Sequence, residues 1–360
     1  MPVCSGIEPP SGFHGEGAYC ATVGTTSTES EPCASARNVI CIGASAGGVE
    51  ALSRLVGALP RHFGAPIFVV QHMPRNGPGL LPTLLARAGM LPVVVPDEPR
   101  EFEPGTVYLP PPDHHIVINE DHVWLTRGPT QNRHRPSIDV LFRSAAAGCG
   151  PRAVGVVLTG VLDDGSAGLL AIKRRGGVAV VQDPSDALFS DMPENAARAV
   201  DVDHCVSLAE LAPLLMTLAR SAVEGAPAAV DAALTREQSD DAGVPTAVGT
   251  NASPSPFSCP ECHGVLWRMD DNTLPRFRCR VGHGFSIESL AQSQDEAVEQ
   301  ALWAAARSLE ERAALSRNMA EQWRLRGLTA LAQELTSKAD GAQSYADKIR
   351  ELIGISSAKR

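Results

Sequence analysis

The sequence lacks the long apolar runs that membrane-spanning helices require. No stretch of its 360 residues approaches the roughly 18 consecutive apolar positions of such a helix, and the first residues have neither the charged start nor the apolar core of a signal peptide. A basic excess is also missing, because 31 Lys and Arg stand against 41 Asp and Glu, for a net charge of −10. These absences argue against membrane insertion and general nucleic-acid binding, and we expect a cytoplasmic protein.

Cysteine is too sparse for a disulfide scaffold, with nine residues in the whole chain. A hydrophobic content of 44% is enough for one large α/β core and a smaller module. Residues 1–38 carry Ser, Thr, Gly, Pro and Glu with little apolar periodicity, which predicts a disordered tail or, alternatively, a short ordered edge element. Residues 223–256 are rich in Ala, Ser, Pro and Thr, which predicts a flexible linker.

An apolar strand that begins at Val39 runs into the turn Gly-Ala-Ser-Ala-Gly at 43–47 and on into a helical pattern. This G-x-S-x-G arrangement is typical of a nucleophile elbow, in which glycines allow a tight turn and the hydroxyl of Ser45 stands at the carboxyl end of a strand. Two alternatives remain open, a phosphate-binding loop for a dinucleotide and a purely structural turn. A dinucleotide fold needs an acidic residue at the end of the second strand, whereas this chain has Gln71 and His72 there.

A serine nucleophile needs a base, and the base needs a carboxylate that orients it. His72 meets the first need because it follows the predicted strand at 65–70, and the carboxyl ends of parallel strands converge on one crevice. A third strand, at 153–159, leads to Asp163 and Asp164 and supplies two carboxylates at the same edge. On the residues alone, ordinary turn and helix-capping chemistry is the favoured explanation of the Asp-Asp-Gly run.

Four blocks in register resemble the catalytic domain of chemotaxis protein-glutamate methylesterases of the CheB type. They read Gly-Ala-Ser-Ala-Gly-Gly at 43–48, Gln-His-Met-Pro at 71–74, Asn-Arg-His-Arg-Pro-Ser-Ile-Asp-Val-Leu-Phe at 132–142 and Leu-Thr-Gly-Val-Leu-Asp-Asp-Gly at 158–165. The resemblance extends from about Val39 to about Ala219. It implies Ser45 as nucleophile, His72 as general base and Asp164 as the residue that orients the base. It also implies hydrolysis of glutamate methyl esters on chemoreceptors, and deamidation of receptor glutamines, without a catalytic cofactor.

The resemblance implies further roles and shows two departures. The backbone N–H groups of Ala46 and Val161 would stabilise the oxyanion. Arg133 and Arg135 would steer an acidic receptor surface or shape the crevice, unless they form ordinary ion pairs that support a loop. Ala46 stands where many members have threonine, and Asp163 stands where asparagine is common. Two adjacent carboxyl groups at the latter place are expected to raise the pKa of one of the pair.

Beyond the predicted linker lies a second cysteine cluster. Cys259 and Cys262 form a C-x2-C pair, and after sixteen intervening residues Cys279 and His283 form a C-x3-H pair. Zinc prefers four thiolate or imidazole ligands in a tetrahedron, and two such pairs joined by a β-hairpin supply that geometry. We therefore predict a zinc ribbon at 257–285 with a structural metal and no catalytic role. A redox C-x2-C pair is disfavoured because the second pair completes the ligand set.

Residues 286–360 turn to Ala, Glu, Gln, Arg and Leu without proline, which predicts a helical tail. Four apolar residues recur at helical spacing and predict a buried stripe: Val298, Leu302, Ala305 and Leu309. Gly327 and Gly341 are the expected breaks, which gives a helical hairpin or a long helix continued after a break. The tail would pack against the zinc module, associate with a second copy of itself, or bind a partner such as a methyltransferase or another pathway protein.

The predicted fold is a doubly wound, mainly parallel α/β esterase domain at 39–222, followed by the zinc ribbon and the helical tail. The predicted function is a serine hydrolase that demethylates a methyl-accepting chemoreceptor or related signalling protein in chemotaxis-like signal transduction. Two other functions stay open: a non-catalytic regulatory protein that acts through the zinc ribbon and helical tail, and a serine esterase with another substrate. Only 38 residues precede the first strand, where the family commonly has a phosphorylatable receiver domain, so we expect a stand-alone form.

Overall fold

The computed structural model describes residues 39–221, 252–269 and 274–357, the last three of these by their backbone alone. The predicted disordered tail at 1–38 and most of the predicted linker lie outside the described residues. Among the helices within them, none combines the length and the apolar character that a membrane crossing needs.

A seven-stranded sheet forms the centre of the part at 39–221. Its neighbouring strands are parallel throughout and follow the order β10-β9-β8-β1-β2-β5-β3. The bounds are β1 (Val39–Ala44), β2 (Ile67–Gln71), β3 (Val93–Val94), β5 (Val107–Tyr108), β8 (Ala153–Val157), β9 (Val178–Gln182) and β10 (His204–Val206). The strand order reverses at β1, so a crevice is expected at the carboxyl ends of β1 and its two neighbours.

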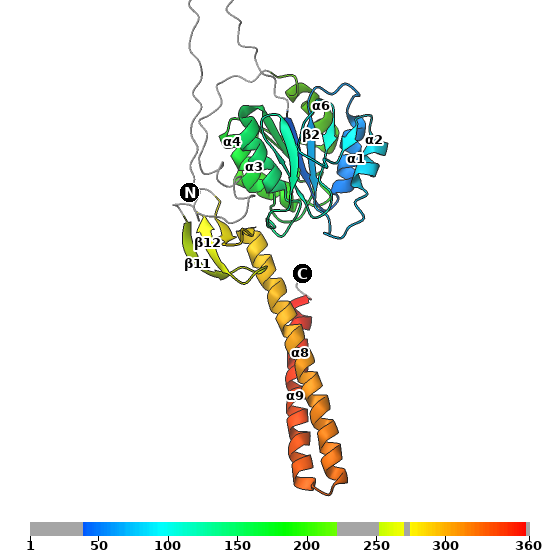
Figure 1. The fold of residues 1–360 in the computed structure, drawn as a ribbon, viewed down its shortest axis with the longest axis vertical. Helices are drawn as coiled ribbons and strands as arrows, with labels where there is room; N and C mark the ends of the chain where they lie inside the picture. The colour runs from blue at the N-terminus through cyan, green and yellow to red at the C-terminus, as the bar shows by residue number, and fades with distance from the viewer. Residues whose placement is uncertain (1–38, 222–251, 270–273, 358–360) are drawn as a thin grey trace, which may run out of the picture. The chain divides into compact units, whose positions relative to one another are not determined.

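Helices cover both faces of this sheet (Figure 1). They are α1 (Gly48–Ala58), α2 (Leu81–Ala88) and α6 (Leu208–Leu218) on one face, and α3 (Ile138–Cys149), α4 (Ser166–Arg174) and α5 (Asp191–Ala199) on the other. Alternate residues of β1 supply the two cores, with Ile40 and Ile42 in the first and Val39 and Cys41 in the second. The predicted doubly wound, mainly parallel α/β fold is confirmed.

The connection between β5 and β8 holds a second, three-stranded antiparallel sheet in the order β4-β7-β6. Its strands are β4 (Arg100–Glu101), β6 (His115–Ile118) and β7 (His122–Thr126). The loop at 127–137 then leads from β7 into α3, and a single 3-10 turn at Gly150–Arg152 leads from α3 into β8. The loop at 127–137 contains the Asn-Arg-His-Arg-Pro segment, which therefore lies just before the start of α3.

Four antiparallel strands form the region of the predicted zinc ribbon, in the order β11-β12-β13-β14. Their bounds are β11 (Ala252–Ser258), β12 (Val265–Met269), β13 (Arg276–Cys279) and β14 (Gly284–Ser286). The segment 252–256, which the sequence assigns to the linker, is therefore part of an edge strand. Pro254 and Pro256 explain the difference, because proline is typical of linkers but is also tolerated in an edge strand.

The helices α8 (Ile287–Leu325) and α9 (Thr329–Ser357) form an antiparallel hairpin (Figure 1). Gly327 makes the turn between them with a φ of 77°, a conformation that glycine adopts readily. Gly341 lies inside α9 and does not interrupt it, so the second predicted break is wrong. A single glycine weakens a helix without ending it when the surrounding residues favour the helix.

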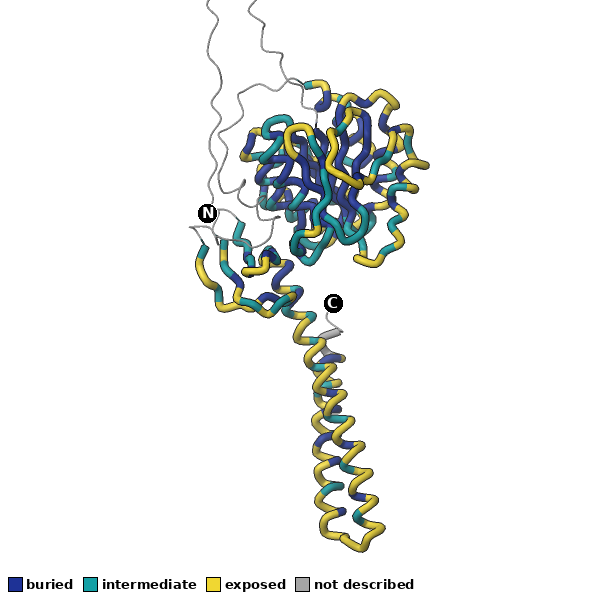
Figure 2. Tube along the Cα trace, in the orientation of Figure 1, coloured by how far each residue is buried: buried dark blue, intermediate teal, exposed yellow. Residues whose placement is uncertain are grey.

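Buried positions recur along both helices of this hairpin among exposed ones (Figure 2), and small side chains with a spacing of seven residues occupy many of them. These are Ala306, Ala313 and Ala320 in α8 and Ala332, Ala339 and Ala346 in α9. Seven residues is the coiled-coil period, and alanine lets the helices approach closely. The predicted stripe is partly wrong, because Val298 and Ala305 are exposed, whereas Leu302 and Leu309 are half-buried beside the alanines. Four positions are too few to fix which side of a long helix faces its partner.

Candidate active site

Ser45 lies in the turn between β1 and α1. Gly47 takes a φ of 75°, which residues with a Cβ rarely adopt, and α1 begins at the next residue. Gly48 is packed so closely that a Cβ there would collide with the Gln71 side chain. Gln71 also donates a 2.8 Å hydrogen bond from Nε2 to the carbonyl oxygen of Ser45, so β2 holds the turn in place.

The structure brings Ser45, His72 and Asp164 together. His72 follows β2 and Asp164 follows β8, and these strands lie on either side of β1. His72 Nδ1 is 3.1 Å from Ser45 Oγ, and His72 Nε2 is 2.7 Å from Asp164 Oδ2. Because an ionised carboxylate only accepts hydrogen bonds, the neutral ring carries its proton on Nε2, and Nδ1 can accept the serine proton.

Asp164 is buried and accepts hydrogen bonds from the loop and the first turn of α3. The donors include the backbone N–H of Ile138 at 2.7 Å, Asn132 Nδ2 at 2.9 Å and Ser137 Oγ at 3.0 Å. Burial alone would raise the pKa of this carboxyl group, but the hydrogen bond and the charge of His72 hold the pKa below its ordinary value. Asp164 therefore stays ionised, and its orientation is fixed.

The pKa of the Asp163 carboxyl group shifts in the opposite direction from that of Asp164. Burial raises the pKa of Asp163 to about 8; the hydrogen bond from Ser286 Oγ, at 2.8 Å, opposes this rise, and the charge of Glu288 adds to it. One of the two adjacent carboxyl groups was expected to have a raised pKa, and Asp163 is that group. The main cause is burial, however, and repulsion by Asp164 is a minor contribution.

A second imidazole covers the ring of His72. The rings of His72 and His134 are stacked, with 3.5 Å between their centroids and 10° between their planes. Burial, followed by the positive charge of His72, lowers the pKa of His134 to about 3, so His134 is neutral near pH 7. A neutral ring in this place does not repel the imidazolium that catalysis would form.

The two residues that the resemblance implies for an oxyanion hole, Ala46 and Val161, both lie near Ser45. Ala46 directly follows Ser45, and Gly160 packs so closely that a Cβ there would be 2.8 Å from Ser45 Cβ, which brings the adjacent Val161 to the same place. Over the part of the chain that the structure describes, neither N–H group donates to a backbone carbonyl. Two backbone donors beside the serine are the arrangement that a tetrahedral intermediate needs.

Arg133 and Arg135 are both held in ion pairs. Arg135 donates to Asp113 from Nε at 2.9 Å and from Nη2 at 2.7 Å, and it also donates to two backbone carbonyls. Arg133 Nη2 lies 2.6 Å from Glu296 Oε2 in α8. These contacts correspond to the alternative in which the two arginines support a loop, and they favour it over a free basic surface.

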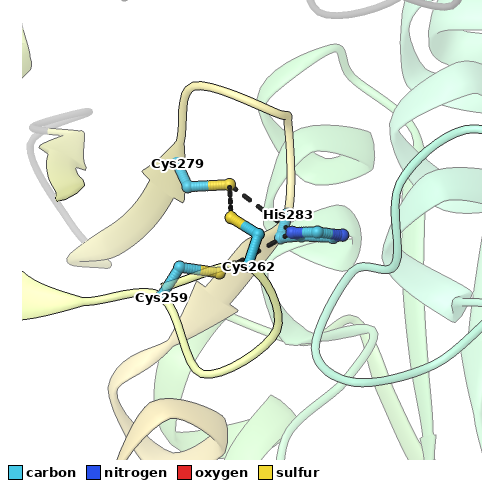
Figure 3. A group of neighbouring side chains, drawn as sticks. All are labelled: Cys259, Cys262, Cys279 and His283. Carbon is cyan, nitrogen blue, oxygen red and sulfur yellow. Dashed lines mark hydrogen bonds between the residues drawn. The ribbon is translucent and has the colours of Figure 1, made fainter. Parts of the chain in front are cut away.

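The four predicted metal ligands converge in the antiparallel sheet (Figure 3). The ligand atoms of Cys259, Cys262, Cys279 and His283 all lie within 4.8 Å of one another. Cys262 Sγ and Cys279 Sγ are 3.6 Å apart, and His283 Nδ1 is 3.6 Å from Cys259 Sγ and 3.5 Å from Cys279 Sγ. Zinc bonds of about 2.3 Å to sulfur and about 2.0 Å to nitrogen imply tetrahedron edges of roughly 3.5 to 3.8 Å, so these residues fit the ion.

The ribbon also contacts the loop that leads into α3, which the sequence did not predict. Asn132 Oδ1 accepts a 2.9 Å hydrogen bond from the backbone N–H of Ser286, and the N–H of Asn132 donates to the Gly284 carbonyl at 2.8 Å. Ser286 Oγ donates to Asp163. Asn132 belongs to one of the four blocks, but nothing in the sequence near it points to a residue 154 positions away.

Known proteins match this chain over its first folded part. The sequence model of the family described as CheB methylesterase matches residues 40–215. A Leptospira interrogans protein, provisionally named protein-glutamate methylesterase/protein-glutamine glutaminase, is 39% identical over 186 residues, which are 51% of this chain and 96% of that protein. The chain belongs to the CheB methylesterase family.

Two further matches each cover about half of the chain. A Methanosarcina mazei relative, named protein-glutamate methylesterase/protein-glutamine glutaminase 2, is 37% identical over 194 residues, which are 52% of this chain and 53% of that protein. The crystal structure of the Thermotoga maritima CheB methylesterase catalytic domain is 29% identical with a TM-score of 0.48, and the match covers 50% of this chain and 98% of that one. The family model ends at residue 215 and so excludes the ribbon and the helical hairpin.

Proposed function

We propose that this chain is a protein-glutamate methylesterase, which hydrolyses the γ-methyl ester of glutamate side chains on a methyl-accepting chemoreceptor or a related signalling protein. The observation that carries the proposal is the continuous hydrogen-bond chain from Ser45 through His72 to Asp164 in a member of the CheB methylesterase family. A serine, a base and an ionised acid in this order are the groups that acyl transfer requires.

The reaction begins when Ser45 Oγ attacks the ester carbonyl carbon and His72 Nδ1 takes the serine proton. Asp164 stabilises the imidazolium through the 2.7 Å contact with Nε2. The backbone N–H groups of Ala46 and Val161 hold the oxyanion of the tetrahedral intermediate. His72 then protonates the leaving methoxy group, and methanol departs. Water, activated by the same imidazole, hydrolyses the glutamyl-serine ester and releases the free glutamate carboxylate.

The same residues support deamidation of a receptor glutamine, with ammonia as the leaving group in place of methanol. Relatives carry both activities in their names. Both substrates present a planar carbonyl carbon on the same short side chain, and attack by Ser45 gives the same kind of tetrahedral intermediate. His72 protonates the leaving nitrogen as it protonates the leaving oxygen, so neither reaction requires a cofactor.

The ribbon is proposed to hold a structural zinc ion. Three thiolates and one imidazole occupy all four tetrahedral positions, which leaves none for a substrate. The helical hairpin is proposed to bind a pathway protein such as a methyltransferase, because its surface includes large apolar residues. Leu325 is 84% exposed and Tyr345 is 62% exposed.

Release of methanol from a methyl-labelled chemoreceptor cytoplasmic domain tests the main proposal. Ser45→Ala should lower the rate by about three orders of magnitude or more, because covalent catalysis is lost. Ser53→Ala is the matched control, since it removes a hydroxyl from α1 away from the site. Wild-type turnover by Ser45→Ala would remove Ser45 as the nucleophile. A wild-type protein that releases no methanol would favour the regulatory alternative, and hydrolysis of small esters alone would favour a different substrate.

A further inference from the structure

A chain of hydrogen bonds connects the ribbon to the candidate triad through one side chain. Asn132 Nδ2 donates to Asp164 Oδ1 at 2.9 Å and to Asp139 Oδ2 at 3.0 Å. Asn132 Oδ1 accepts from the backbone N–H of Ser286 at 2.9 Å and from Ser289 Oγ at 3.3 Å. Asn132 is 6% exposed, so water does not compete effectively for these bonds.

The two ends of this amide are not interchangeable. If the Asn132 amide were rotated by 180°, its oxygen would face two carboxyl groups and its NH2 group would face the N–H of Ser286. Each of these contacts would then lose its hydrogen bond. The N–H of Ser286 therefore selects the orientation in which Asn132 donates to Asp164. Ser286 is both the last residue of β14 and the N-cap of α8, so two elements fix the position of this N–H.

Backbone hydrogen bonds attach the same loop to the ribbon. The N–H of Asn132 donates to the Gly284 carbonyl at 2.8 Å, and the N–H of Gly284 donates to the Thr130 carbonyl at 3.2 Å. Gln131 Nε2 donates to the Gly282 carbonyl at 2.9 Å. Gly282 and Gly284 flank His283, a predicted zinc ligand. The segment that would ligate zinc is therefore also the segment that holds the loop.

From these contacts we propose that Ser286 is a positioning residue for the esterase reaction. Its backbone N–H orients the Asn132 amide, and that amide holds Asp164. Asp164 in turn fixes the tautomer of His72. The inference rests on the proposed function, and it gives the ribbon a role in turnover in addition to its own folding. The helical tail would influence the reaction through Ser286, the N-cap residue of α8.

Ser286→Pro in the zinc-loaded full-length protein tests this inference. Proline removes the N–H, and the φ of −73° at Ser286 is one that proline adopts without a change of backbone. Ile287→Pro is the control, because it places proline at the first helical position and leaves the N–H of Ser286 intact. Ser286→Ala serves as the reference for the lost hydroxyl, because it lacks the hydroxyl as Ser286→Pro does but keeps the N–H.

We expect Ser286→Pro to lower kcat about tenfold with KM unchanged, the size of effect that corresponds to one hydrogen bond to a charged network. Ile287→Pro should stay within about twofold of the wild type, and Ser286→Ala should retain more activity than Ser286→Pro because it keeps the N–H. A second readout needs no substrate: nitrogen NMR of histidine-labelled protein reports which ring nitrogen of His72 carries the proton. The wild type should show the Nε2–H tautomer alone, whereas Ser286→Pro should show both tautomers.

An unchanged kcat together with an unchanged His72 tautomer in folded Ser286→Pro would overturn the inference. If that variant loses the ribbon structure, Ser289→Ala decides by the same two readouts, since it removes the 3.3 Å donor and should lower kcat about threefold. An unchanged Ser289→Ala protein would then overturn it. A wild-type protein without esterase activity would reject the proposed function instead, and the NMR comparison would still decide the positioning.

Discussion

Asp163→Asn should remove a pH dependence from the stability of the protein. Burial raises the pKa of Asp163 to about 8 in the folded protein, whereas the ordinary value is 3.8. Between these values the unfolded chain has lost the proton and the folded protein keeps it. The free energy of unfolding therefore falls as the pH rises from about 4 to about 8, and falls no further above that range. Asparagine does not titrate, so this decrease should disappear.

The size of the effect has an upper bound set by one proton. One pH unit corresponds to about 1.36 kcal/mol, and the interval from 3.8 to about 8 gives at most about 6 kcal/mol. Asp163 is only half-buried, and screening by solvent reduces the effect. We expect Asp163→Asn to be more stable than the wild type by about 1 to 3 kcal/mol at pH 8, and by little at pH 4.

Urea unfolding at pH 4, 6 and 8, followed by hydrogen exchange of β1 and β8, measures the free energy of unfolding of the esterase part. Asp97→Asn is the matched control, because it neutralises an exposed acid outside the site. Its stability should follow that of the wild type at every pH. If Asp163→Asn and the wild type lose stability in parallel from pH 4 to pH 8, the carboxyl group of Asp163 is not protonated in the folded protein and the reasoning fails.

Two further predictions concern the acid of the triad and the metal. Asp164→Asn should lower kcat by about 10³ to 10⁴, because asparagine does not hold His72 in the required tautomer, whereas Asp163→Asn should stay within about threefold. Equal losses in the methanol-release assay would contradict the assignment of Asp164. Zinc chelation should speed hydrogen exchange in β12 and β13 and leave β1 and β8 protected, because a structural zinc contributes about 10 kcal/mol or more to folding. Slow exchange in a zinc-free ribbon would contradict a structural metal.

The central sheet and the grouping of the three candidate catalytic residues were predictable from local patterns. Each apolar run ends in a residue with useful chemistry, Ser45 after the first, His72 after the second and Asp164 after the third. Parallel strands place their carboxyl ends at one edge, so the distances along the chain do not matter once the strands are recognised. The proposed oxyanion donors are backbone groups and leave no mark in the sequence. Their positions were available through the family resemblance alone.

Local patterns were misleading where two structures share one composition. The proline-rich segment 252–256 has the composition of a linker but forms an edge strand. It does so because it pairs with β12, and this pairing is not visible in the local sequence. The apolar positions of α8 allow several faces, and α9 selects the one that carries the alanines. In both cases the deciding partner is another element of the fold, and intrinsic propensity has little influence.

The link between Asn132 and Ser286 could not be predicted because each residue has a complete local explanation. Ser286 caps α8, and Asn132 lies in a turn. Asp163 is the informative exception. It stands where the family commonly has asparagine, and it is the residue that accepts the Ser286 hydroxyl. The carboxyl group that departs from the family pattern beside the candidate triad is therefore the group that the ribbon contacts, through the hydrogen bond from Ser286 to Asp163. A partner that shifts the start of α8 would move Ser286, and through Asn132 it would act on Asp164 without touching the crevice.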